Sequence, residues 1–232
     1  MPPYLDRPEA RLEEAVDSVE LPYGITAVGI VNAINDMYAY LHALNNASVE
    51  HGYSRLDDMM QPAGFSGLLS NVFVRSLARA FGSSTPGLAI NQWGRGRPDL
   101  VPRAVYPNDA VLRGDQGIEV KVSGYGSGWQ GHNPETGWIC IVQVAIDRIA
   151  EPVYERLPTI VDRVMIANLV ESDWTFSGRS ATSRRTPTAS INGDGYRKLE
   201  QGGVYVRAGF STVRVVRRRS VRRRQTPRAP TP

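Results

Sequence analysis

The hydrophobic pattern of the chain changes near Pro86, and this change restricts the possible folds more than any other feature. Before it, apolar residues recur at steps of three and four positions, which is typical of helices with one buried face. After it, short apolar runs are separated by Gly, Pro, Asn and Asp, which is typical of strands joined by turns. We therefore expect an α/β fold with a central mixed β-sheet flanked by α-helices.

Three helices are expected in the first part of the chain. Residues 8–20 begin with proline and carry acids in the first turns, so this charged helix should be peripheral. Residues 26–44 and 64–81 each have one apolar stripe, and Gly82 supplies a stop signal for the second of them. These two helices should pack against the sheet.

Five strands are expected in the second part. Pro107, Asn108 and Asp109 form a turn that should join the first two strands as a hairpin. The expected strands cover residues 100–106, 117–123, 138–147, 161–170 and 204–216.

Length and composition favour one domain. The chain has 232 residues, of which 41% are hydrophobic, and this is enough for one substantial core. We expect a single domain over 1–216, with a helical part (1–82) and a sheet-rich part (86–216), followed by a disordered tail (217–232). No stretch approaches the roughly 18 consecutive apolar residues of a membrane-spanning helix, and the N-terminus does not resemble a signal peptide. The chain is therefore expected to be soluble and cytoplasmic, without a membrane partner.

Basic residues concentrate at the C-terminal end. The formal net charge is +4, and residues 217–232 hold seven arginines and no acids, so removing those seven charges leaves −3 on the rest. A basic tail on a mildly acidic body suits a polyanion such as nucleic acid, because phosphate contacts supply much of the affinity. The alternative is a solvated tail without a partner.

Two short segments carry groups suited to phosphodiester hydrolysis. Asp99 stands at the start of one expected strand, and Glu119 and Lys121 lie within the next. Because alternate strand residues share a face, Glu119 and Lys121 should point to the same side. If the hairpin brings Asp99 alongside, two carboxylates converge where Mg²⁺ can bind together with water and phosphate oxygens. Lys121 would orient or deprotonate the attacking water and offset charge on the attacked phosphate.

Pro98-Asp99, followed 20 positions later by Glu119-Val120-Lys121, resembles the PD-(D/E)XK signature of type II restriction endonucleases and related nucleases. The resemblance covers about residues 60–175. It implies a restriction-endonuclease-like fold, catalysis by Asp99, Glu119 and Lys121, Mg²⁺ bound by Asp99 and Glu119, and double-stranded DNA as the substrate of a homodimer. The alternative is that Glu119 and Lys121 form an exposed pair on a solvated strand face.

Many members of this superfamily add an acidic residue from a helix before the PD motif. Here Asn71 stands where that acid is expected. Glu50 and Gln143 are candidates to complete the metal site, but an ordinary surface carboxylate and a polar residue at the sheet margin are equally compatible interpretations.

A Gly-rich loop follows the strand that carries Lys121. Long loops in compact domains are commonly functional, so it is a candidate to close over the substrate. Tyr125 or Trp129 would pack on sugars or bases, and His132 or Asn133 would bond to phosphate or base edges. A simple flexible loop is the alternative.

A second polar stretch, residues 177–190, combines hydroxyl side chains with Arg179, Arg184 and Arg185. Arginine bonds guanine edges in a bidentate manner, and Ser and Thr add phosphate contacts. This stretch is the first candidate for the DNA recognition region, with a solvated surface loop as the alternative.

These features together predict a Mg²⁺-dependent endodeoxyribonuclease, a sequence-specific type II restriction endonuclease in particular. A DNA repair or recombination nuclease would use the same three residues. A rival from another class is a non-catalytic nucleic-acid-binding protein with a degenerate nuclease fold, which Asn71 and the basic tail favour. The complete set of Asp99, Glu119 and Lys121 disfavours this rival.

Overall fold

The computed structural model describes residues 6–12, 20–84, 86–94, 97–124, 129–131, 133–152, 155–176 and 188–210. Its helices are α1 (Ala27–Glu50), α2 (Leu56–Met59), α3 (Pro62–Phe81) and α4 (Gly193–Gln201). Its strands are β1 (Leu88–Ile90), β2 (Leu100–Pro102), β3 (Ile118–Ser123), β4 (Gln130–Gly131), β5 (Gly137–Ala145), β6 (Ile160–Leu169), β7 (Trp174–Phe176), β8 (Ala189–Ile191) and β9 (Gly203–Val206).

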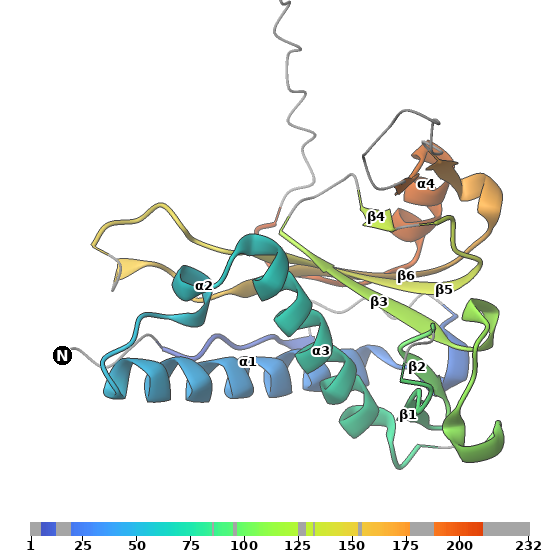
Figure 1. Ribbon diagram of the computed structural model, residues 1–232, viewed down its shortest axis with the longest axis horizontal. Coiled ribbons are helices and arrows are strands. Elements are labelled where there is room, and N and C mark those ends of the chain that lie inside the picture. Colours follow the sequence, from blue (N-terminus) through green and yellow to red (C-terminus); the bar gives the residue numbers. More distant parts are fainter. Residues whose placement is uncertain are drawn as a thin grey trace, which may run out of the picture.

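The main sheet has six strands in the order β1-β2-β3-β5-β6-β9 (Figure 1). β3 and β5 are parallel, and every other neighbouring pair is antiparallel. The expected α/β fold with a mixed sheet flanked by helices is therefore confirmed. A small second sheet, in the order β4-β8-β7, is not hydrogen-bonded to the main one.

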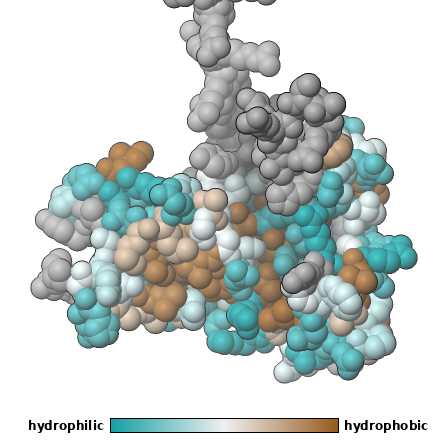
Figure 2. Space-filling view, viewed as in Figure 1, coloured by the Kyte–Doolittle hydropathy of each residue, from teal (hydrophilic) through white to brown (hydrophobic). Residues whose placement is uncertain are grey.

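The two faces of the main sheet are covered differently. α1 and α3 lie together across one face, where they pack on Ile118, Val120 and Val142 (Figure 1). Figure 2 shows apolar residues gathered between α1 and the sheet, beside α3. On the other face, Ile139 and Ile141 belong to a second apolar cluster that includes residues of α4 and of the small sheet. Alternation along β3 and β5 thus supplies two separate cores.

α1 begins one residue after the predicted start at Thr26, which is its N-cap, and ends six residues after the predicted end at Leu44. The side chain of Thr26 accepts a hydrogen bond from the Gly29 N–H and caps the helix. The helix continues past the predicted end to Glu50, and the Asn45 side chain accepts a hydrogen bond from the Leu56 N–H at 3.0 Å, which joins α1 to α2. A side chain at Gly29 would overlap the ring of Phe81, so this glycine allows α1 and α3 to approach closely.

The helix expected over 8–20 is wrong for the part that the structure describes. Residues 8–11 are not helical, and residues 13–19 lie outside the described residues. The backbone N–H and carbonyl of Ala10 bond to the side chain of Asn35 on α1, at 2.8 and 3.0 Å. The segment therefore lies against α1 as irregular chain, and the hydrogen bonds of Ala10 are made with α1 and not within a helix of its own.

The antiparallel pairing of the first two expected strands is confirmed, but the tight hairpin between them is wrong. β2 pairs with β3 only at Leu100 and Ile118. Residues 107–109 form a 3₁₀ turn in a long connection, which contains a second such turn at Gly114–Gln116. The strand expected over 204–216 ends at Val206, and residues 211–232, including the basic tail, lie outside the described residues.

Several short elements give no usable periodicity in the sequence. β1, β7 and β8 have three residues each, which is too short for alternation to be read. α4 contains two glycines and begins at Asn192, whose side chain accepts hydrogen bonds from the N–H groups of Asp194 and Gly195. Within the described part of the chain, no helix has the length and apolar character needed to cross a membrane.

Candidate active site

Asp99 lies beside Glu119 and Lys121 because β2 and β3 are neighbours. The pairing of Leu100 with Ile118 places the residue before β2 next to the middle of β3. Asp99 Oδ2 accepts a hydrogen bond from the Val120 N–H at 2.8 Å, which attaches the carboxylate to the edge of the strand. The three residues that the sequence analysis grouped are therefore adjacent.

The approach of β2 to β3 depends on Gly117. A side chain at this position would overlap the carbonyl oxygen of Leu100 and would come within 2.5 Å of the Pro98 ring. Farther along β3, the Val120 carbonyl accepts a hydrogen bond from Ser70 Oγ of α3 at 3.2 Å. The N–H and the carbonyl of Val120 are therefore both bonded to side chains, those of Asp99 and Ser70. Among the described residues, no strand pairs with β3 at this position on the edge that faces β2.

Glu119 and Lys121 share one face, as the alternation along the strand predicts. Lys121 Nζ lies 3.1 Å from Glu119 Oε1 and 3.2 Å from Glu135 Oε2. Arg97 contacts Glu135 Oε1 directly, and its Nε lies 3.9 Å from Glu119 Oε1. Two carboxylates therefore alternate with two cations, all but Arg97 largely shielded from solvent.

Glu135 is the site residue that sequence reasoning missed. It lies near the end of the Gly-rich loop, two residues before β5. Because β5 runs parallel to β3 with Trp138 opposite Ile118, the start of β5 lies beside the start of β3. The position of Glu135 just before β5 would have pointed to the site only if the parallel pairing of β5 with β3 had been known.

The carboxylates of the site perturb one another. Burial raises the pKa of Asp99 to about 6, and the neighbouring Glu119 carboxylate adds to the rise. The Val120 N–H and the Lys121 ammonium oppose this shift in the pKa of Asp99. Burial also raises the pKa of Glu135, an effect that Lys121 opposes. Ionised Asp99 is therefore destabilised by its surroundings, and an added cation would relieve this destabilisation.

The donor chemistry of Asp99 and Glu119 fits Mg²⁺. Among the described residues, no group of three or more His, Cys, Asp or Glu side chains is placed to hold a metal ion. Mg²⁺, however, commonly takes only one or two carboxylates and completes its shell with water and substrate phosphate oxygens. The paired carboxylates and the raised pKa of Asp99 are compatible with such an open site.

The three candidates for an additional metal-supporting group do not join the site. Asn71 is exposed on α3, and its neighbour Ser70 is the residue that reaches β3. Glu50 is exposed at the end of α1, which packs on the opposite face of the sheet. Gln143 is buried and accepts a hydrogen bond from Arg163 Nε at 2.7 Å.

The predicted DNA-contacting residues are described only in part. Trp129 is 4% exposed, and its ring stacks on Tyr196 with the centroids 5.5 Å apart. Asn133 is exposed. Tyr125, His132, Arg179, Arg184 and Arg185 lie outside the described residues. DNA contact by any of these residues stays a prediction.

Two surface clefts meet at β3. The first contains Glu119, Glu135, Arg97, Arg113 and Asn133 in its lining. The second lies between α3 and β3 and is lined by Ser66, Gly67, Ser70, Lys121, Val122, Ser123 and Trp129. Glu119 and Lys121 therefore open toward different clefts, so a ligand at the site has space on both sides.

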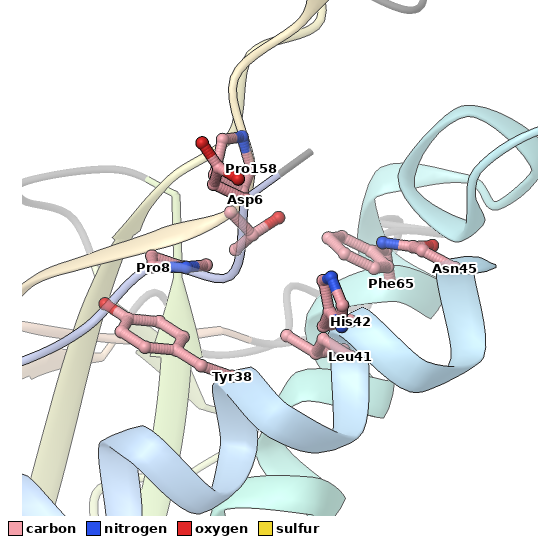
Figure 3. A pocket seen from close by; sticks show the side chains of 9 residues that line it. Asp6, Pro8, Tyr38, Leu41, His42, Asn45, Phe65 and Pro158 are labelled. Carbon is pink, nitrogen blue, oxygen red and sulfur yellow. The ribbon is translucent and has the colours of Figure 1, made fainter. Parts of the chain in front are cut away.

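A third pocket is separate from this site. It is lined by Tyr38, Leu41, His42 and Asn45 of α1, together with Phe65, Asp6, Pro8, Pro158 and Thr159 (Figure 3). The Tyr38 hydroxyl accepts a hydrogen bond from the Val161 N–H at 2.7 Å, so this hydroxyl connects α1 to β6. Tyr38, Leu41 and Phe65 belong to the core on the helical face, away from the face that carries Glu119 and Lys121.

No protein-family model, curated protein or solved structure matches the chain. The proposed function therefore rests on the residues of the site and on their geometry.

Proposed function

We propose that the chain is a Mg²⁺-dependent endodeoxyribonuclease with a restriction-endonuclease-like fold. The observation that carries the proposal is the convergence of Asp99, Glu119 and Lys121 on neighbouring strands, with Asp99 bonded to the Val120 N–H. The same residues form the sequence pattern that resembles the PD-(D/E)XK signature. A pair of carboxylates beside an ammonium group suits hydrolysis of a phosphodiester, which needs a metal site and a group that acts on water.

Each residue has a distinct role in this reaction. Asp99 and Glu119 would hold Mg²⁺, which supplies Lewis-acid stabilisation of charge on the phosphate when it is bound. Lys121 directs Nζ toward the same carboxylate cluster, so it orients the attacking water by hydrogen bonding and offsets negative charge that develops on the phosphate. The hydrogen bond from Val120 fixes the direction of the Asp99 carboxylate.

The proposed substrate is double-stranded DNA. Arg97 and Arg113 line the cleft that contains Glu119, and guanidinium groups at a cleft wall suit contacts with the phosphates of DNA. We extend the proposal to a sequence-specific type II restriction endonuclease that acts as a homodimer, with recognition by the Gly-rich loop and by residues 177–190.

Incubation of the purified chain with mixed-sequence plasmid DNA and Mg²⁺ tests the proposal. Discrete fragments would support sequence-specific restriction, and a smear would indicate a nonspecific nuclease such as a repair or recombination enzyme. Removal of Mg²⁺ with a chelator should stop either reaction. The matched control is Asp99→Asn, which keeps the shape of the side chain but removes its charge.

DNA that stays intact would contradict the proposal. It would favour a non-catalytic nucleic-acid-binding protein, which two observations support. The carboxylates of the site already have cationic neighbours in Lys121 and Arg97, and Asn71 supplies no additional acid.

A further inference from the structure

Glu135 is a buried carboxylate that contacts both cations of the site. It is 7% exposed. One of its oxygens contacts Arg97, and the other lies 3.2 Å from Lys121 Nζ. Both contacts link the Gly-rich loop to the strands that carry Asp99 and Lys121, so Glu135 is placed to influence the catalytic groups.

The backbone of Glu135 is fixed as firmly as its side chain. Its carbonyl oxygen accepts a hydrogen bond from the indole Nε1 of Trp174 at 2.8 Å, and Trp174 belongs to the second apolar cluster. A side chain at Gly131 would come within 2.7 Å of Glu135 Oε1, so the glycine leaves room for the carboxylate. Glu135 is therefore anchored to the protein core through its backbone, and its contact with Lys121 is largely shielded from solvent.

Lys121 requires a second carboxylate partner to hold its ammonium group, because Glu119 is also proposed to bind the metal. Glu119 lies 3.1 Å from Lys121 Nζ, but it is also one of the two proposed Mg²⁺ ligands. A lysine that contacted only Glu119 would move with that carboxylate when the metal bound. Small displacements of a catalytic group are costly, because about 1 Å of misplacement lowers rates by up to about 100-fold.

We propose that Glu135 is a positioning residue that holds Lys121 Nζ and the Arg97 guanidinium in place for attack on the DNA phosphate. This inference rests on the proposed function. Glu135 acts through its two cationic neighbours, and the anchor at Trp174 allows it to keep them in place while Glu119 binds the metal.

The first test measures the mobility of Lys121 and does not depend on activity. Lys121 and Lys198 are the only two lysines of the chain, so isotopic labelling of lysine gives two side-chain NMR signals, which Lys198→Arg assigns. Glu135→Gln keeps the shape of the side chain but turns a donor toward one of the two cations. The Lys121 side chain should become more mobile in this variant. Lys198 should not change, because its own partner, Asp173, is 2.7 Å away.

The second test is kinetic. Glu135→Gln should lower kcat for DNA cleavage by about tenfold or more while KM changes by less than about twofold, because positioning acts on the attack and not on binding. The matched control is Glu171→Gln, which makes the same chemical change at an exposed residue that lines neither cleft. This control should keep the parental kcat.

Unchanged mobility of Lys121 in folded Glu135→Gln protein would overturn the inference. A parental kcat despite a more mobile Lys121 would overturn it as well. If the parent protein cleaves no DNA, the proposed function is wrong, and the NMR measurement alone decides whether Glu135 holds Lys121.

Discussion

The side chains of the candidate site are each oriented by a group from another part of the chain. The Val120 N–H orients Asp99, and Glu135 contacts both Lys121 and Arg97. The chemistry of the site therefore depends on contacts between segments that are distant in the sequence. Asp99 leads to two predictions and Lys121 to one.

Mg²⁺ affinity should depend on pH through Asp99. Because the pKa of Asp99 is raised to about 6, a proton competes with the metal below that pH. The affinity for Mg²⁺ should therefore increase as pH rises through about 6 and level off above it. Calorimetric titrations with Mg²⁺ across this range measure the effect.

The raised pKa of Asp99 also makes the free energy of unfolding depend on pH. The folded protein binds the Asp99 proton more tightly than the unfolded chain, whose pKa is near the ordinary 3.8. Without metal, the contribution of Asp99 to the free energy of unfolding should thus be largest at low pH and decrease as pH rises from about 4 to about 6. Asp99→Asn should remove both effects, and an affinity that is flat across this range in the parent protein would contradict the assignment.

Lys121→Ala should abolish cleavage and leave folding and DNA affinity nearly intact. The lysine acts on the attacking water in the proposed reaction, and loss of such a group typically lowers rates by about 10² to 10⁴-fold. Cleavage rates and DNA binding with Ca²⁺ in place of Mg²⁺ separate the two effects. Lys198→Ala is the control, since it removes the other lysine, which pairs with Asp173. A Lys121→Ala protein that cleaves at the parental rate would show that the catalytic assignment is wrong.

At the scale of elements, the site depends on how closely two short segments approach. β2 and β3 pair at a single position, and Gly117 allows the backbone to pass next to Leu100. α3 completes the arrangement, because Ser70 bonds to the Val120 carbonyl at the edge of β3, beyond the position where β2 pairs. The geometry of Asp99 relative to Glu119 is therefore sensitive to small shifts between these elements.

Gly117→Ala should weaken Mg²⁺ binding as well as the fold. The added methyl group would overlap the Leu100 carbonyl and push β2 from β3, at a cost of about 1 to 3 kcal/mol in the free energy of unfolding. Gly29→Ala is the matched control, because its methyl group would overlap Phe81 between α1 and α3, on the face opposite the site. Denaturant unfolding and Mg²⁺ titration distinguish the two variants. Equal Mg²⁺ affinity in both would contradict the role given to Gly117.

At the scale of the whole molecule, one sheet separates two kinds of environment. The helical face carries the larger core, and the opposite face carries both the second apolar cluster and the charged site. The site opens to solvent through the two clefts that border β3. The basic residues at the end of the chain lie outside the described residues, so their contribution is a matter for experiment.

Removal of residues 217–232 should weaken DNA binding without abolishing cleavage. The segment holds seven arginines and none of the proposed catalytic groups. The dependence of log K on log salt should become shallower by roughly 0.9 for each phosphate contact that is lost, which binding at several salt concentrations measures. A full-length variant with glutamine in place of these seven arginines should behave like the truncated chain. An unchanged salt slope would mean that the tail makes no phosphate contacts.

Local rules were enough for the features that belong to a single element. The two long helices follow from their apolar stripes, and the common face of Glu119 and Lys121 follows from alternation along a strand. The neighbourhood of Asp99 also followed from sequence, since an antiparallel pair of successive strands was expected there. The first two features depend on residues within one element, and the third depends on two strands that follow one another in the chain.

Tertiary structure decided the features that join distant segments. Glu135 reaches Lys121 because β5 pairs in parallel with β3, and Ser70 is the α3 residue that bonds to β3, while its neighbour Asn71 is exposed. Gln143 bonds to Arg163 instead of joining the site. Periodicity fixes the direction of a side chain relative to its own element. The position of one element against another depends on the packing of many side chains from both, and that information is not local in the sequence.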